Sequence, residues 1–327
     1  MIARRWLKRI GAGLLAITVL GAGLAYRAYR SDMTAIRARL EAGSQVAATR
    51  CGPVEYAIRG EGPPVVVVHA TGGSYDQGLL IGRVFVGDGY RVIAPSRFGH
   101  LRTPQAADAT AEGQADMLAC LMDALRVERA PVLGMSAGGP VALQLALRHA
   151  ERVTAMVLLS TAAYIPPSSG VVRRLPAPDI VYRTLFSSDF LFWGVVRVAG
   201  PALAASFGAT PELQARIPPE EKAFLAAMIE GMLPIRMHTA GLANDAALAD
   251  RSFVTPYPTE RIGAPVLVVQ AQDDTAAVPA GGVYLAEHIP GAKLVLYPDG
   301  GHALLGHHAE IKAEVRAFLG RAGAAPR

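Results

Sequence analysis

Residues 134–138 read Gly-Met-Ser-Ala-Gly and fit the pattern Gly-x-Ser-x-Gly, in which the serine can act as a nucleophile. The apolar run 130–133 before them predicts a buried strand, and residues 139–150 after them have the apolar spacing of a helix. A turn this tight between strand and helix has room only for small neighbours, which accounts for the two glycines. We therefore expect Ser136 to stand at the carboxyl edge of a sheet.

A serine hydroxyl is a weak nucleophile at its ordinary pKa, so it needs a neighbouring base. His302 follows two glycines, Gly300 and Gly301, just beyond the predicted strand 293–297. This location puts the imidazole at the same sheet edge as Ser136, on a loop that can bring it across. His302 is therefore the expected general base.

The base in turn needs an acid that orients it. The predicted strand 265–270 is followed by Ala-Gln and then by Asp273 and Asp274, whereas the chain after the strand 153–159 has no carboxylate. We expect Asp274 to be the acid and Asp273 to cap or brace the loop. Asp273 remains the alternative acid.

A tetrahedral oxyanion needs two preorganised N–H donors. The first is expected from Ala137, directly after the nucleophile. The second is expected from the loop of small residues after the strand 65–68, with Thr71 as the donor and Ala70 or Gly72 as alternatives. His69, in the same loop, is interpreted as structural.

Strand-like and helix-like segments alternate from residue 54 to the end, which predicts an α/β fold with a doubly wound, mostly parallel sheet. Residues 165–255 interrupt the alternation with helix-like segments, several prolines and aromatic side chains such as Phe190 and Trp193. We interpret this insertion as a helical cap over the serine, with an apolar pocket beneath it.

In these motifs and in their order the chain resembles the α/β-hydrolase superfamily over roughly residues 50–320. The resemblance rests on residues 69–73, 91–100, 134–138, 273–274 and 301–302. It implies a serine hydrolase, and we expect it to cleave a carboxylic ester. The apolar side chains of the insertion predict that the acyl group is apolar. Relatives that cleave amides, lactones or C–C bonds use the same triad, so those reactions remain alternatives, and a non-catalytic binding protein of this fold at the membrane is a third.

No organic cofactor or metal is expected. The adjacent His307 and His308 point about 100° apart in a helix, which does not suit a shared metal. His149 and His288 fall near helix ends and are interpreted as surface residues. Two cysteines are too few for a disulfide framework, and Cys120 is interpreted as a buried free thiol.

The N-terminal segment carries most of the positive charge. Residues 1–41 have a net charge of +6 in a chain whose total is +5, so the remainder is near neutral and does not predict a nucleic-acid surface. The uncharged run 10–26 would span about 26 Å as a helix, close to the roughly 30 Å of a bilayer core.

We therefore divide the chain into residues 1–45, an N-terminal segment and linker, and residues 46–327, the hydrolase domain with its insertion. The first segment is interpreted as a membrane anchor with the catalytic domain outside the cytoplasm. A cleaved signal peptide, giving a secreted or periplasmic protein, and a soluble amphipathic arm are the alternatives.

Overall fold

The computed structural model describes residues 2–170, 184–205 and 207–324, and divides the chain into two compact units, Met1–Ala42 and Gly43–Arg327. The first unit is one long helix, α1 (Ile2–Ala42). From Ile10 onward this helix has the length and hydropathy of a membrane span, a property that signal sequences share.

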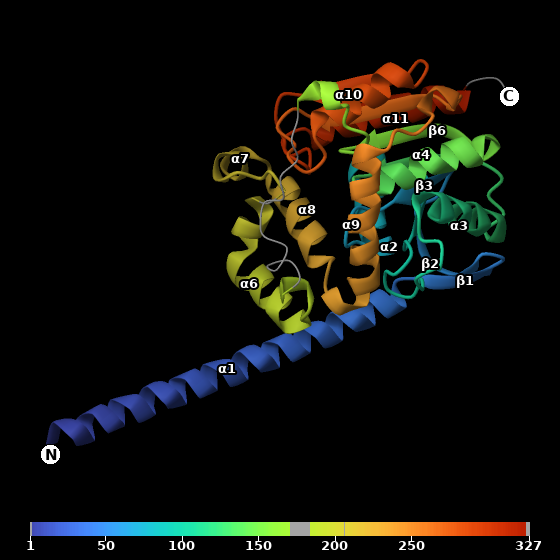
Figure 1. Ribbon diagram of the computed structural model, residues 1–327. Coiled ribbons are helices and arrows are strands. Elements are labelled where there is room, and N and C mark those ends of the chain that lie inside the picture. Colours follow the sequence, from blue (N-terminus) through green and yellow to red (C-terminus); the bar gives the residue numbers. More distant parts are fainter. Residues whose placement is uncertain (1, 171–183, 206, 325–327) are drawn as a thin grey trace. The chain divides into compact units, whose positions relative to one another are not determined.

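The second unit is built on an eight-stranded sheet with the order β1-β2-β4-β3-β5-β6-β7-β8 (Figure 1). The β1–β2 and β2–β4 pairs are antiparallel and the other pairs are parallel. This confirms the predicted doubly wound, mostly parallel sheet. The strands are β1 (Gln45–Thr49), β2 (Gly52–Arg59), β3 (Pro64–Val68), β4 (Arg91–Pro95), β5 (Ala130–Met135), β6 (Val153–Leu159), β7 (Val266–Ala271) and β8 (Lys293–Tyr297).

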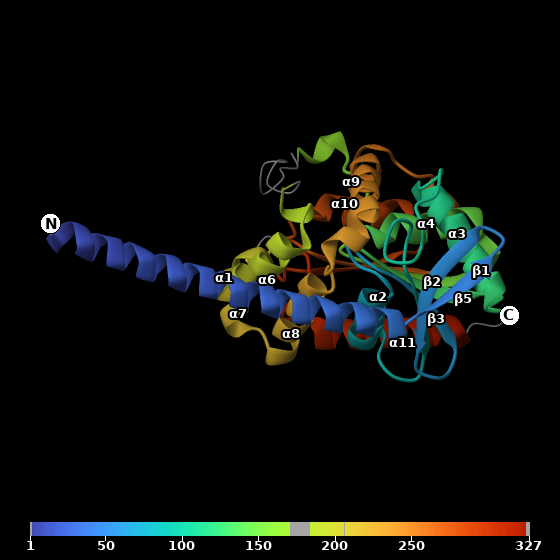
Figure 2. The same cartoon turned by 90° about the horizontal axis from the view of Figure 1, so that it is seen from below.

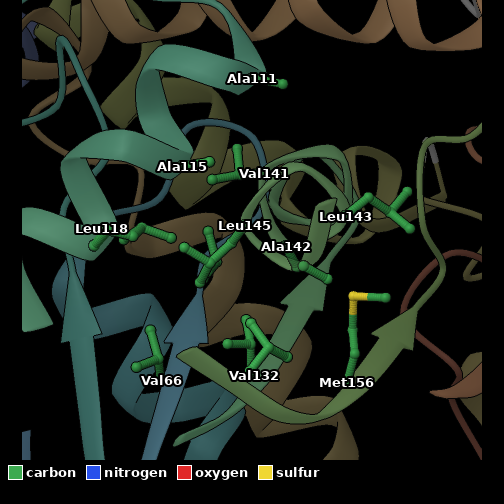
Figure 3. Packing of buried hydrophobic residues seen from close by; sticks show 14 of the residues in the cluster. Val66, Ala111, Ala115, Leu118, Val132, Val141, Ala142, Leu143, Leu145 and Met156 are labelled. Carbon is green, nitrogen blue, oxygen red and sulfur yellow. The ribbon is translucent and has the colours of Figure 1, made fainter. Parts of the chain in front are cut away.

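Helices cover both faces of the sheet because the central strands are apolar on both sides. In β3, Val66 and Val68 pack on one face with α3 (Ala111–Ala124), α4 (Gly138–Arg148) and α10 (Pro279–His288), as Figure 3 shows for Val66, Leu118 and Leu145. The alternate residues Val65 and Val67 pack on the other face with α2 (Tyr75–Ile81), the π-helical turn Gly82–Val86 and α11 (His308–Ala324).

The predicted insertion leaves the sheet after β6 and returns before β7. Its described part is helical and contains no strand, whereas residues 171–183 and 206 lie outside the described residues. Figures 1 and 2 show its helices grouped at one end of the sheet. They are α6 (Asp189–Ala205), α7 (Pro211–Arg216), α8 (Pro219–Glu230) and α9 (Thr239–Val254).

One expectation about the cysteines was wrong. Cys51 and Cys120 form a disulfide that joins the β1–β2 turn to α3, with their Cα atoms 6.0 Å apart. The sequence pattern did not predict β1, and the two cysteines are separated by 69 residues. Only the hairpin made by β1 and β2 brings Cys51 against the helix that carries Cys120.

Candidate active site

Ser136 lies in the turn between β5 and α4 with φ of +52°, a left-handed conformation that is strained for any residue except glycine. A side chain on Gly134 would come within 2.7 Å of the Gly138 carbonyl oxygen, and one on Gly138 would collide with the Val68 carbonyl. Hydrogen bonds hold the turn, because Ser136 N donates to Leu159 O at 2.9 Å. The two glycines are therefore a steric requirement of this turn.

His302 lies on the loop after β8, and its Nε2 is 2.9 Å from Ser136 Oγ. The loop turns through Gly300 and Gly301, whose φ values are +123° and +58°. The backbone N–H of His302 donates to the Phe207 carbonyl of the insertion at 3.0 Å. Ser136 and His302 are both 9% exposed, so the pair is largely shielded from water.

Asp274 follows β7 and contacts the other side of the imidazole. Its Oδ2 and Oδ1 are 2.9 Å and 3.1 Å from His302 Nδ1. Oδ1 also accepts the N–H groups of Ala276 and Ala277, both at 2.9 Å, and Oδ2 accepts Gln270 Nε2 at 3.0 Å. These donors fix the orientation of the carboxylate.

Asp273 binds the backbone of the loop that leads to His302. Its carboxylate accepts the N–H of Gly301 at 2.8 Å and that of Gly300 at 3.3 Å. Of the two neighbouring carboxylates, Asp274 therefore meets His302, and Asp273 binds the backbone of the loop that carries the histidine.

Three residues of the loop after β3, Ala70, Thr71 and Gly72, could supply the second N–H donor to an oxyanion. Ala70 N donates to Gln77 Oε1 at 2.8 Å and Gly72 N donates to Asp245 Oδ2 at 3.1 Å. Among the described residues, the N–H groups of Thr71 and Ala137 have no hydrogen-bond acceptor. Thr71 and Ala137 thus keep the donors that an oxyanion would need, whereas Ala70 and Gly72 do not.

His69 is buried and holds the same loop, because its Nε2 accepts the backbone N–H of Arg97 at 3.0 Å and its Nδ1 lies 2.7 Å from Ala70 O. Burial first, and then the nearby charges of Arg97 and His100, lower its pKa well below the ordinary value. A neutral imidazole that serves the backbone agrees with the structural role expected for it.

Sequence reasoning missed a buried ionic cluster beside this loop. Arg97 Nη1 lies 2.6 Å from Asp245 Oδ1, and His100 Nε2 lies 3.3 Å from Asp245 Oδ2. His100 Nδ1 is 3.1 Å from His238 Nδ1, and all four side chains are almost fully buried. Arg97 and His100 belong to a motif visible in the sequence, but their partners Asp245 and His238 are more than 130 residues away.

Burial and neighbouring charges both shift the pKa values of Asp245 and His238 in this cluster. Burial alone would raise the pKa of Asp245, but Arg97 and His100 lower it overall, so the carboxylate is charged. Burial, with His100 as the second cause, lowers the pKa of His238 to about 3 and keeps that ring neutral.

Each of the four remaining histidines contacts a carboxylate or a backbone carbonyl. No group of three possible metal ligands occurs in the described part of the chain. His307 Nε2 lies 2.8 Å from Asp299 and His308 Nε2 lies 2.9 Å from Ala303 O. His288 is exposed, whereas the predicted surface residue His149 is half-buried, with its Nε2 2.7 Å from Asp116.

Two adjoining surface hollows, of about 310 and 690 Å³, lie between α3, α4, α9 and residues 255–261. Arg251 and Tyr257 line both, and neither hollow includes Ser136. His302 and Asp274 are not among the lining residues of either hollow.

Comparison with known proteins agrees with this architecture. Residues 63–309 match the α/β hydrolase fold family, and the chain belongs to that family. An α/β hydrolase fold protein from Nakamurella multipartita is 28% identical, with a TM-score of 0.73, over 86% of this chain and 100% of its own.

Two curated relatives are enzymes. The 2-hydroxymuconate semialdehyde hydrolase of Pseudomonas putida is 28% identical over 81% of this chain and 90% of its own length. A pimeloyl-[acyl-carrier protein] methyl ester esterase of Neisseria meningitidis is 27% identical over 66% of this chain and 77% of its own length. The protein is an α/β-hydrolase enzyme.

Proposed function

We propose that the protein is a serine hydrolase that cleaves a carboxylic ester through Ser136, His302 and Asp274. The observation that carries the proposal is the continuous contact from Ser136 Oγ to His302 Nε2 and from His302 Nδ1 to Asp274, each at 2.9 Å. This arrangement is the one by which a base activates a hydroxyl and a carboxylate fixes the tautomer of the base.

In the proposed reaction, Ser136 Oγ attacks the carbonyl carbon while His302 Nε2 accepts the hydroxyl proton. The N–H groups of Ala137 and Thr71 stabilise the tetrahedral oxyanion. The C–O bond then breaks, and His302 returns the proton to the leaving alcohol. Water attacks the resulting acyl-serine by the same two proton transfers and releases the carboxylic acid.

An ester with an apolar acyl group is the proposed substrate. The methyl ester esterase among the relatives supports the ester, and the aromatic side chains of α6 support the apolar group. We further propose that the insertion over residues 165–255 acts as a cap, since the Phe207 carbonyl in it binds the backbone of His302.

Hydrolysis of a C–C bond is the second candidate, because one relative is a 2-hydroxymuconate semialdehyde hydrolase. The same triad serves both reactions, as it serves amide and lactone cleavage. Comparing kcat/KM for p-nitrophenyl esters with that for 2-hydroxymuconate semialdehyde distinguishes the two. A non-catalytic binding protein of this fold would turn over neither substrate.

The decisive variant is Ser136→Ala. We expect hydrolysis of p-nitrophenyl butyrate to fall by several orders of magnitude, since triad nucleophiles typically contribute about 10⁶-fold to kcat. A fluorophosphonate probe should label the wild type on Ser136, as read by peptide mass spectrometry, and should not label the variant. Activity of the folded variant within tenfold of wild type would contradict the proposal.

We propose that residues 1–45 anchor the enzyme in a membrane and that residues 46–327 form the hydrolase domain outside the cytoplasm. The apolar helix from Ile10 supports the anchor. The disulfide between Cys51 and Cys120 supports an oxidising compartment, because cytosolic thiols are normally kept reduced. A cleaved signal sequence would give the same compartment without the anchor.

A further inference from the structure

Asp245 joins the insertion to the loop that holds Thr71. It lies on α9, is 1% exposed, and its Oδ2 accepts the N–H of Gly72 at 3.1 Å. Gly72 has φ of +68° and follows Thr71 directly. A carboxylate of the insertion therefore holds the backbone one residue beyond the proposed oxyanion donor.

Arg97 connects the same carboxylate to the other side of this loop. Its Nη1 is 2.6 Å from Asp245 Oδ1, and its Nη2 donates to the Ala70 carbonyl at 3.3 Å. Ala70 N is bound by Gln77 at 2.8 Å, so the residues on both sides of Thr71 are fixed by buried partners. The pair Asp245–Arg97 thus closes a ring of contacts around a single amide that stays unoccupied.

Taking two charged groups out of water costs free energy, and removing one of them leaves an uncompensated charge in the interior. The rest of α9 already packs on the core through apolar contacts such as Leu248. The Asp245–Arg97 pair therefore supplies something that apolar packing does not, which is a fixed acceptor for the Gly72 N–H.

A carboxylate of the insertion also binds the backbone of the loop that carries His302. Glu221 of α8 is 4% exposed, and its carboxylate accepts the backbone N–H groups of Gly306 and His308. Two carboxylates of the insertion therefore bind the backbones of the two loops on which the proposed chemistry depends.

We propose that Asp245 is a positioning residue that holds Thr71 N–H in place to receive the oxyanion, so that the insertion completes the oxyanion hole as well as covering it. The inference rests on the proposed ester hydrolysis. It predicts that loss of the Asp245 carboxylate weakens binding of the transition state and leaves binding of the ground state unchanged.

The first test is Asp245→Asn. Arg97 and the Gly72 N–H meet different oxygens of the carboxylate, and the amide NH2 that replaces one of these oxygens can only donate. We expect kcat for p-nitrophenyl butyrate, per active site titrated with a fluorophosphonate, to fall roughly 10- to 100-fold with KM little changed, because losing one oxyanion donor outright costs about 10²–10³-fold. The same factor should appear in the Ki of a trifluoromethyl ketone, whose hemiketal oxygen mimics the oxyanion. The Ki of butyrate, a ground-state ligand, should change less than threefold.

The matched control is Asp189→Asn. Asp189 is also a buried carboxylate of the insertion, 5% exposed, and it accepts the N–H of Arg236, a residue that lies in neither loop. We expect this control to lower thermal stability without changing the ratio of the two Ki values.

The double variant Asp245→Leu with Arg97→Met replaces the ion pair by apolar groups of similar size, which such sites often tolerate. It still removes the acceptor of Gly72 N–H, so it should show the same kinetic loss and decides the matter where the single variant does not fold. A folded variant with kcat within threefold of wild type would overturn the proposal, as would equal losses for both inhibitors. If the wild type itself hydrolyses no ester and binds no trifluoromethyl ketone, the proposed function fails instead.

Discussion

At the scale of residues, the adjacent Asp273 and Asp274 make different contacts. Asp274 meets His302 Nδ1 at 2.9 Å, while Asp273 binds the backbone N–H of Gly301 at 2.8 Å. Both carboxylates serve the same histidine loop, but only Asp274 can select the tautomer that leaves His302 Nε2 free to accept a proton. The two residues are therefore expected to fail differently when they are neutralised.

We predict that Asp274→Asn lowers kcat by about 10⁴, because a wrongly oriented imidazole cannot act as the base. Asp273→Asn should lower kcat much less and should mainly reduce thermal stability, since an amide oxygen can still accept the N–H of Gly301. Steady-state kinetics of both variants on p-nitrophenyl butyrate measure the difference. A larger loss in Asp273→Asn would reverse the assignment.

At the scale of elements, the insertion forms hydrogen bonds with the loop after β3 and with the loop that carries His302, which its sequence did not predict. It leaves the sheet after β6, where Leu159 O binds the N–H of Ser136, and returns before β7, which leads to Asp274. Within it, Phe190 and Trp193 stack with ring centroids 6.0 Å apart on α6. The two ends of the insertion lie close together, because Ile165 N donates to Phe253 O at 3.0 Å.

We predict that Phe190→Ala or Trp193→Ala changes the ranking of kcat/KM among p-nitrophenyl esters of different acyl length. A lost apolar contact is worth about 1–3 kcal/mol, so the change should be between roughly 10- and 200-fold. Val254→Ala, at a position of α9 whose side chain is 73% exposed, serves as the control. Variants that lose stability but keep the wild-type ranking would show that the aromatic residues only pack.

At the scale of the whole molecule, the chain separates into Met1–Ala42 and Gly43–Arg327. Every residue proposed for the chemistry belongs to the second unit. The net positive charge and the long apolar run belong to the first. Catalysis and attachment should therefore be separable.

We predict that a chain starting at Gly43 is soluble without detergent and hydrolyses p-nitrophenyl butyrate with the kcat/KM of the full chain. The full chain should stay in the membrane fraction after carbonate extraction, because a helix that spans the bilayer is not released by loss of charge interactions. Release by carbonate together with a mature N-terminus near Tyr26 would instead favour a cleaved signal peptide.

The sequence by itself determined the order of the central elements and the family. Continuous apolar strands such as β3 and the glycines around Ser136 are local features, because each follows from the sterics of a few consecutive residues. Ser136 and His302 could be selected in the same way, since each lies in the loop after a predicted strand at one edge of a parallel sheet, whereas the sequence left the choice between Asp273 and Asp274 open. Their catalytic roles stay predictions.

Tertiary structure decided what depends on residues far apart in the chain. The disulfide joins Cys51 to Cys120, and Asp245 reaches back 173 residues to Gly72. No local pattern distinguishes Asp245 from an exposed helical aspartate, and β1 is a short, half-exposed edge strand without an apolar run. Burial, pairing and long-range hydrogen bonds are properties of the packed chain, so the cluster that holds the Thr71 loop forms only where α9 packs on the loop after β4.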